Sequence, residues 1–168
     1  MNLNKFNSIS GSLKSHERLI AVSKGQDLTK IIRLYNKGQR DFGENFLQEL
    51  KEKKDLLPAD IRWHFLGNIQ SNKIKDIVMC SDLIHSIGRN KILDKILKLE
   101  SNKKIKILLQ LKLGEEETKS GFKEKEIYKI LSGNESKNLI IKGLMVIAEG
   151  GIQKERLKLQ FIQAKNVF

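Results

Sequence analysis

The chain has 168 residues, which suits one domain, and 39% of them are apolar, which is enough for a core. The formal net charge of +12 would permit nucleic-acid binding, but the lysines are spread along the chain among acidic residues, so we expect a solvated basic surface. No apolar run could span a membrane, and stretch 1–15 lacks the apolar centre of a signal peptide. The single cysteine, Cys80, cannot form an internal disulfide. We therefore expect a cytoplasmic protein.

Short apolar runs alternate with stretches of helical spacing along the chain. The pattern predicts strand Leu19–Ser23, a helix between the N-cap Asp27 and the stop Gly38, strand Asp41–Glu44, helix Phe46–Lys54 and strand Arg62–Leu66. It continues with helix Ser71–Val78, strand Leu83–Ile87, helix Lys91–Leu99, strand Ile105–Leu113, helix Glu124–Leu131, strand Ile140–Ile147 and helix Gln153–Ala164. Six strand–helix units in series predict an α/β fold with a parallel sheet and right-handed crossovers.

Such a sheet is either open and doubly wound or closed into a barrel. An open nucleotide-binding sheet usually carries a glycine-rich loop after its first strand. Here the first strand ends in Ser23–Gln26, which is not such a loop. The periodicity alone leaves the choice between the two architectures open.

Lys24 stands at the carboxyl end of the first predicted strand, which is the catalytic face in a barrel. It follows the apolar run Leu19–Val22, so we expect partial desolvation, which lowers the pKa of an amine and makes it a better nucleophile. The alternative is an ordinary surface lysine, and in a chain so rich in lysine the position alone favours that alternative.

Several strand ends together resemble those of a known family. The matching segments are the strand end Ala21–Lys24, the element Asp41–Asn45, and the stretch Trp63–Gly67 with Gln70–Lys73. In this order and spacing they are similar to the pyridoxal phosphate homeostasis proteins, which are built like the N-terminal barrel of alanine racemase. The resemblance runs from about Leu19 to Met145, and it implies a (β/α) TIM-type barrel.

The resemblance implies roles for four matching residues. Lys24 aligns with the lysine that holds pyridoxal phosphate as a Schiff base, and Asn45 with an asparagine near this cofactor. Met145 lies at the strand end that helps to wall the cofactor ring. His64 is a further candidate for cofactor binding, with a packed histidine bonded to backbone as the alternative.

The resemblance also implies a function without turnover: a protein of vitamin B6 homeostasis that holds pyridoxal phosphate and passes it to apoenzymes that depend on it. A racemase of the related fold uses a tyrosine from a second domain, whereas Tyr35 and Tyr128 lie on predicted helices away from the strand ends. A racemase-like enzyme is therefore the second hypothesis, and a nucleic-acid-binding protein is the third. The histidines and Cys80 show no ligand spacing for a metal, and Glu115–Glu117 predict a solvated loop.

The resemblance predicts one incomplete barrel domain over residues 1–168, because six of about eight units are recognisable. In the family, the last two units hold the cofactor phosphate and contact the pyridine nitrogen, and no counterpart follows Phe168. We therefore expect weaker cofactor binding than in a complete barrel, and open sheet edges that favour self-association. An inactive remnant is the remaining alternative.

Overall fold

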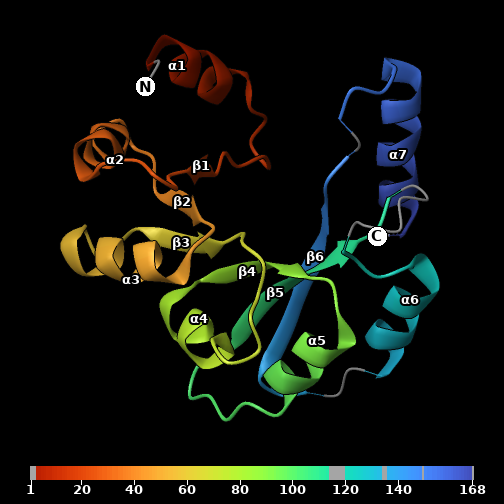
Figure 1. Ribbon diagram of the computed structural model, residues 1–168. Helices are drawn as coiled ribbons and strands as arrows, with labels where there is room; N and C mark the ends of the chain where they lie inside the picture. The colour runs from red at the N-terminus through yellow and green to blue at the C-terminus, as the bar shows by residue number, and fades with distance from the viewer. Residues whose placement is uncertain (1–2, 114–119, 134–135, 149, 168) are drawn as a thin grey trace. The chain divides into compact units, whose positions relative to one another are not determined.

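The computed structural model describes residues 3–113, 120–133, 136–148 and 150–167. The chain divides into two compact units, Met1–Gly67 and Asn68–Phe168. Each unit is built around three parallel strands, and Figure 1 gives the labels of the elements. Among the described residues, no helix combines the length and the apolar character that crossing a membrane requires.

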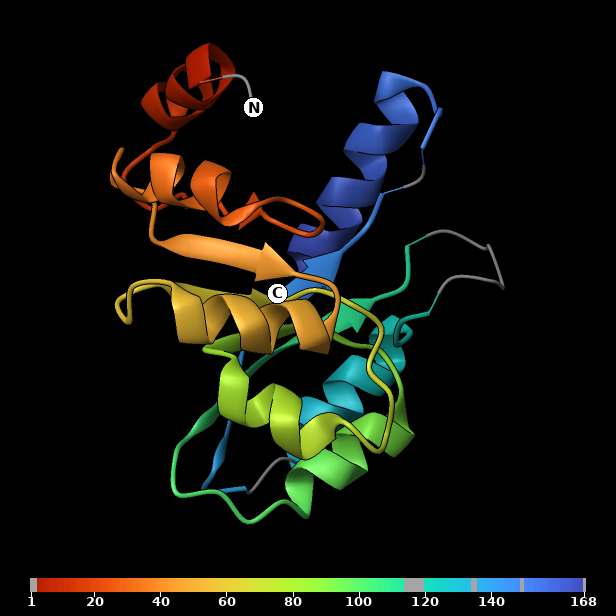
Figure 2. The same ribbon diagram turned by 60° about the vertical axis from the view of Figure 1, so that its left-hand side comes forward.

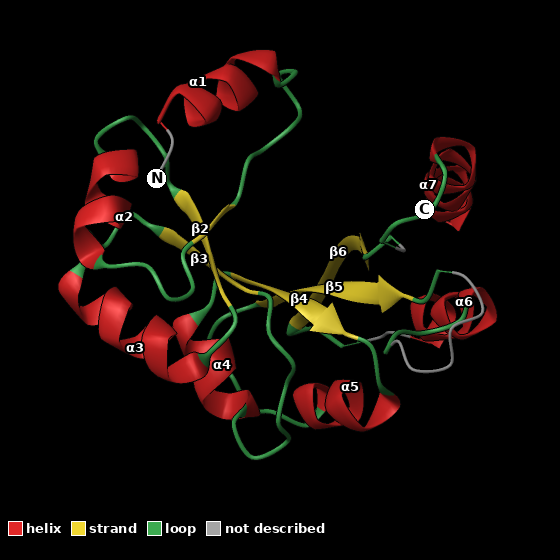
Figure 3. Cartoon of the chain, turned by 45° about the horizontal axis from the view of Figure 1, so that its top comes forward, coloured by secondary structure: helices red, strands yellow, loops and turns green. Residues whose placement is uncertain are grey.

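The first unit carries helices on one side of a short parallel sheet. Its elements are α1 (Leu3–Ser12), β1 (Ala21–Val22), α2 (Leu28–Tyr35), β2 (Asp41–Glu44), α3 (Leu47–Leu56) and β3 (Arg62–Phe65). Strand β2 pairs with β1 and with β3, and the register aligns Val22, Gly43 and His64 in one row across the sheet. Helices α2 and α3 lie on the same side of β2 and β3 (Figure 3).

Alternation along the strands gives this sheet two different faces. One face packs against the helices: Phe42 and Trp63 are buried there with ring centroids 6.1 Å apart, and Leu50 of α3 is buried with them. Gly43 and His64 lie on the opposite face. A Cβ at Gly43 would come within 2.6 Å of the Leu66 side chain, so glycine leaves the room that this neighbour fills.

Local signals explain the ends of helix α2. The side chain of Asp27 accepts a hydrogen bond from the backbone N–H of Lys30 at 2.9 Å, which satisfies a donor that the first helical turn leaves unpaired. Gly38, just beyond the helix, has a φ of 92°, a conformation that favours glycine. The cap and the stop that the sequence predicts are therefore both present.

The second unit repeats the strand–helix pattern. Its elements are α4 (Ile74–Cys80), β4 (Leu83–Ile87), α5 (Asn90–Leu97), β5 (Ile105–Leu111), α6 (Glu124–Gly133), β6 (Leu139–Val146) and α7 (Lys154–Val167). Strand β5 pairs in parallel with β4 and with β6. Ile107 and Leu109 of β5 are fully buried, as are Ile127 of α6 and Ile87 of β4, so these side chains form the centre of this unit's core.

All six predicted strands and all six predicted helices are confirmed; most bounds shift by a few residues, two differences have a clear structural cause, and one helix is additional. Strand β1 covers only Ala21–Val22, and helix α4 begins at Ile74 because Gln70–Lys73 form a turn, in which the N–H of Lys73 donates to the carbonyl of Gln70 at 2.9 Å. Helix α1 was not predicted. Its apolar residues Leu3, Phe6 and Ile9 stand at helical spacing in a polar stretch, and none of its residues is buried.

Candidate functional site

Lys24 occupies the second position of a tight turn that follows β1. The N–H of Gln26 donates to the carbonyl of Ser23 at 3.0 Å, and Gly25 has a φ of 64°, which the third position of a type II turn requires. The Lys24 side chain is exposed and forms no hydrogen bond or ion pair with any described residue. The expectation of partial desolvation is wrong here, because the strand ends at Val22 and the turn carries Lys24 beyond it.

Both neighbours of Lys24 are held by side chains from other elements. The Ser23 hydroxyl donates to Oε1 of Glu44 at 2.7 Å, and the Ser23 carbonyl accepts from Nζ of Lys53 at 2.7 Å. The Gly25 N–H donates to Oε2 of Glu49 at 2.8 Å. The backbone on each side of Lys24 is therefore fixed to β2 and α3, while the Lys24 side chain forms no hydrogen bond or ion pair with the described residues.

These contacts belong to a buried charge cluster of Glu44, Glu49 and Lys53. The Lys53 ammonium donates to Glu44 Oε1 and to Glu49 Oε2, each at 2.7 Å, so with Ser23 it uses all three of its donors. Lys53 is 6% exposed and Glu44 is fully buried. Burial by itself lowers the pKa of Lys53, but the hydrogen bonds that Lys53 donates to Glu44 and Glu49 outweigh it and raise that pKa.

Helix α3 explains why Glu49 and Lys53 both contact the turn that carries Lys24. Glu49 and Lys53 are four residues apart and therefore share one face of the helix. Figure 2 shows α3 running beside β2 and β3. The hydrogen bond from Lys53 and the N–H of Gly25 together lower the pKa of Glu49, which keeps this carboxylate ionised.

Asn45 follows β2 directly and is half-buried. Its backbone lies against Gly67, where an added Cβ would come within 1.9 Å of the Asn45 carbonyl oxygen. The N–H of Leu66 also donates to the carbonyl of Glu44 at 2.8 Å. The ends of β2 and β3 are thus joined so closely that only glycine fits at position 67, and this contact fixes the backbone of Asn45.

His64 lies in the middle of β3 and is 8% exposed. Its Nε2 is 3.0 Å from Oδ1 of Asp41, which also accepts a hydrogen bond from Nε of Arg62 at 2.8 Å, while Oδ2 accepts from the same guanidinium. The Arg62 hydrogen bonds, helped by His64, lower the pKa of Asp41 to about 2. This contact favours a structural role for His64 over direct cofactor binding.

Met145 lies in β6 of the second unit, half-buried and opposite Gln110 of β5. Of the four predicted residues, Lys24, Asn45 and His64 therefore belong to the first unit and Met145 to the second. Glu115–Glu117 lie outside the described residues. Within the described part of the chain, no group of three His, Cys, Asp or Glu side chains could hold a metal ion.

The sequence analysis did not identify the residues that hold the turn. Ser23 lies within the predicted strand and Glu44 within the matching element Asp41–Asn45, but neither is predicted to have a role at the site. Glu49 and Lys53 belong to the predicted solvated basic surface. The spacing of Glu49 and Lys53 was an available signal, because a glutamate four residues before a lysine favours an ion pair on one helix face. That spacing does not reveal burial, which depends on how α3 packs against the sheet.

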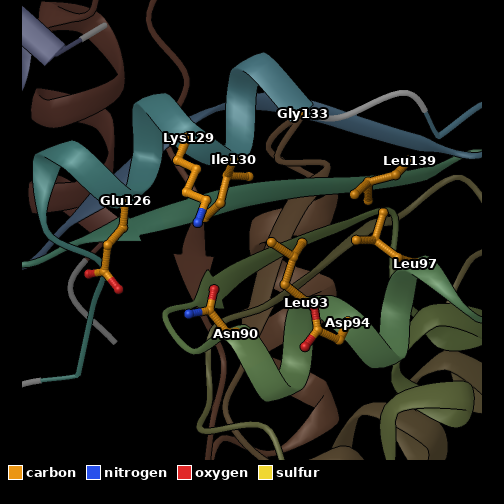
Figure 4. Close-up of a pocket in the computed structure, with 9 residues that line it drawn as sticks. All are labelled: Asn90, Leu93, Asp94, Leu97, Glu126, Lys129, Ile130, Gly133 and Leu139. Carbon is orange, nitrogen blue, oxygen red and sulfur yellow. The ribbon is translucent and has the colours of Figure 1, made fainter.

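A separate hollow lies in the second unit between α5, α6 and the start of β6 (Figure 4). Its volume is about 410 Å³. Leu93, Leu97 and Ile130 give it an apolar part, and Asp94 and Lys129 give it a polar part. None of the four predicted site residues lines it, so it is not the site that the sequence indicates.

Comparison with known proteins identifies the class first. The chain matches the family model for the alanine racemase N-terminal domain over residues 2–166. It superposes on alanine racemase of Clostridium difficile with a TM-score of 0.75 at 14% identity, covering 98% of this chain and 45% of that one. The fold is therefore the (β/α) barrel of the alanine racemase N-terminal type, and six of its parallel strands lie in the described residues.

Relatives nearer in sequence identify the family. The pyridoxal phosphate homeostasis protein of Synechocystis sp. is 38% identical over 96% of this chain and 77% of its own length. The human protein of that name is 33% identical over 80% of this chain, which spans 54% of its length. PipY of Synechococcus elongatus, solved with PLP bound, is 32% identical with a TM-score of 0.89, covering 98% of this chain and 78% of PipY. The chain belongs to the pyridoxal phosphate homeostasis protein family.

Proposed function

We propose that this chain binds pyridoxal phosphate through Lys24 and serves the homeostasis of that cofactor without a turnover reaction of its own. The observation that carries the proposal is the state of the Lys24 amine. It stands at a strand end on a turn fixed from both sides, and it forms no hydrogen bond or ion pair with the described residues. The names of the relatives and the PLP bound to PipY support the proposal.

The chemistry of the group fits this amine. Pyridoxal phosphate would supply an aldehyde, with which the neutral Lys24 amine would condense as a Schiff base and release one water. The contribution of this chain is to present Lys24 on a fixed turn, without a carboxylate partner among the described residues.

The other predicted residues have more limited roles in the proposal. The backbone of Asn45 lies against Gly67 where β2 and β3 end, and we expect the Asn45 side chain to contact the cofactor. We expect Met145 to supply apolar contact to the ring. His64 stays a candidate, although its hydrogen bond to Asp41 competes with any bond to a ligand.

The tyrosines favour a carrier over a racemase. Tyr35 lies in α2, and its hydroxyl donates to Oδ1 of Asp60 at 2.6 Å. Tyr128 lies in α6 and is exposed. Neither is at the carboxyl end of a strand, where the catalytic residues of such barrels lie. Apoenzymes as recipients, self-association and a cytoplasmic location are further parts of the proposal.

Two variants and an activity assay test this function. We expect Lys24→Ala to abolish covalent attachment of pyridoxal phosphate, followed by the absorbance of the bound cofactor. Lys91→Ala removes an exposed lysine of α5 and should leave attachment unchanged. Racemisation of amino acids should be absent with added cofactor. Equal attachment to wild type and Lys24→Ala would contradict the assignment of the lysine, and racemisation would favour the enzyme.

A further inference from the structure

The charge cluster of Glu44, Glu49 and Lys53 is too costly to be explained by stability alone. Removing a lysine and a glutamate from water costs several kcal/mol, and well-packed apolar residues often serve a fold as well as a buried ion pair. Here Oε2 of Glu44 also lacks a hydrogen-bond partner among the described residues. A buried group in that state is a further cost. The location of the cluster, directly against the turn that carries Lys24, indicates a purpose related to that lysine.

The cluster controls the charge that surrounds Lys24. Two carboxylates contact its neighbours: Glu44 binds Ser23, and Glu49 binds the N–H of Gly25. A carboxylate beside an amine stabilises its protonated form, and a protonated amine cannot attack an aldehyde. Lys53 engages both carboxylates at 2.7 Å and so removes them as partners for Lys24.

The remaining charges near the turn are also paired. Asp27 follows the turn by one residue, and its carboxylate caps α2 and lies 3.2 Å from Nζ of Lys30. The same lysine also donates to the Gln26 side chain at 3.2 Å. The acids next to the Lys24 turn therefore pair with lysines other than Lys24: Asp27 pairs with Lys30, and Glu44 and Glu49 share Lys53.

We propose that Lys53 is a positioning residue: it holds the Lys24 turn through the Ser23 carbonyl and pairs with Glu44 and Glu49, so that the Lys24 amine stays available to an aldehyde. This inference rests on the proposed function, because it concerns the same amine. Lys53 does not itself touch the cofactor in this account. It acts on the backbone and on the local charge.

The test is the pH dependence of labelling at Lys24. Wild type and variants are mixed with pyridoxal phosphate at a series of pH values and reduced with borohydride, and the label on Lys24 is measured over time by peptide mass spectrometry. Lys53→Met leaves the charges of Glu44 and Glu49 unmatched beside the Lys24 turn. We expect the midpoint of labelling to move up by about one pH unit and the rate at neutral pH to fall about tenfold.

Two further variants keep the test decisive if Lys53→Met folds poorly. Glu49→Gln removes a charge from a side chain that is 30% exposed, and its amide oxygen can still accept from Gly25. Local charge becomes more positive, so labelling should begin at lower pH than in wild type. The double variant Lys53→Met/Glu49→Gln should return the midpoint towards that of wild type, since it restores the net charge of the wild-type cluster.

A control separates this role from simple loss of stability. Arg40→Met breaks the pair with Asp60 and the contact with the Tyr35 ring, away from the Lys24 turn. It should lower the urea midpoint of unfolding without moving the pH midpoint of labelling. An unchanged pH midpoint in both Lys53→Met and Glu49→Gln would overturn the inference and leave the cluster a structural feature. Absence of label on Lys24 in wild type would instead contradict the proposed function.

Discussion

Asp41 is the residue at which pH and stability are most directly linked. Its pKa of about 2 in the folded chain lies below the ordinary 3.8, chiefly because Arg62 donates to both of its oxygens. A carboxyl group whose pKa is lowered by folding stabilises the folded chain at pH values above the pKa that the group has in the unfolded chain. This stability is lost as the pH falls from about 4 to about 2. The Asp41 carboxylate also contacts Nε2 of His64 and so holds this side chain beside β2.

We therefore expect Asp41→Asn to lower the free energy of unfolding by about 1–2 kcal/mol near neutral pH, after allowance for solvent screening. The difference from wild type should shrink as the pH falls below about 4, because the wild-type carboxyl is then protonated as well. Urea unfolding at several pH values measures this difference. A gap that stays constant down to pH of about 2 would show that the Asp41 charge is not its source.

The difference between Lys24 and Lys53 shows what the sequence could reveal about single residues. The position of Lys24 at a strand end favoured an ordinary surface lysine, and the resemblance of several strand ends to a known family is what identified it. Lys53 could not be identified, because its burial depends on the packing of α3 against β2 and not on any neighbour in sequence. A resemblance names the residue that would react, whereas the contacts that prepare it appear only in three dimensions.

At the scale of elements, the accuracy of the predictions follows how much of each element is buried. The bounds of β2 and β4 agree with the prediction at both ends, and most of the residues in both strands are buried. Helix α1 was missed, since none of its side chains is buried. Helix α7 was predicted with different bounds, and it buries only Gln160 and Val167 among its described residues. Apolar periodicity therefore reports burial first and secondary structure second.

The join between β2 and β3 gives a prediction at this scale. An added methyl group at Gly67 would lie 1.9 Å from the Asn45 carbonyl oxygen, and backbone cannot move aside as a side-chain end can. We expect Gly67→Ala to cost about 2–3 kcal/mol of unfolding free energy, or more, by forcing the strand ends apart. It should also weaken cofactor attachment, because Asn45 moves with its backbone.

Gly11→Ala is the matched control for this substitution. A Cβ at Gly11 meets nothing within 4 Å, and the residue lies inside α1, where alanine is preferred over glycine. Urea unfolding should show it to be neutral or slightly stabilising. If Gly67→Ala were as mild as Gly11→Ala, the close approach of β2 and β3 would not be a constraint in solution.

At the scale of the whole molecule, the chain divides into two compact units. Whether they unfold together as one domain, as the sequence predicts for residues 1–168, stays a prediction. Its test uses Trp63, the one tryptophan, which is buried in the first unit. Tryptophan fluorescence reports on that unit, and far-ultraviolet circular dichroism reports on helices in both units. One domain predicts coincident urea transitions from the two probes. A fluorescence transition separated from the dichroism transition would indicate two domains that unfold independently.

The net charge of +12 belongs to the same scale. The lysines are dispersed, so we expect any binding to a random DNA duplex to be weak and to disappear as salt approaches physiological concentration. Fluorescence anisotropy of a labelled duplex measures this. Tight binding that persists at high salt would favour the nucleic-acid hypothesis over the cofactor hypothesis.

The central claim concerns which amine of this lysine-rich chain reacts with the aldehyde of pyridoxal phosphate. The most direct measurement is to incubate the wild-type chain with a limiting amount of the cofactor, reduce it with borohydride, digest it and map the modified peptide by mass spectrometry. We predict that the label lies predominantly on the peptide that contains Lys24. A label distributed over many surface lysines, with no preference for Lys24, would contradict the account.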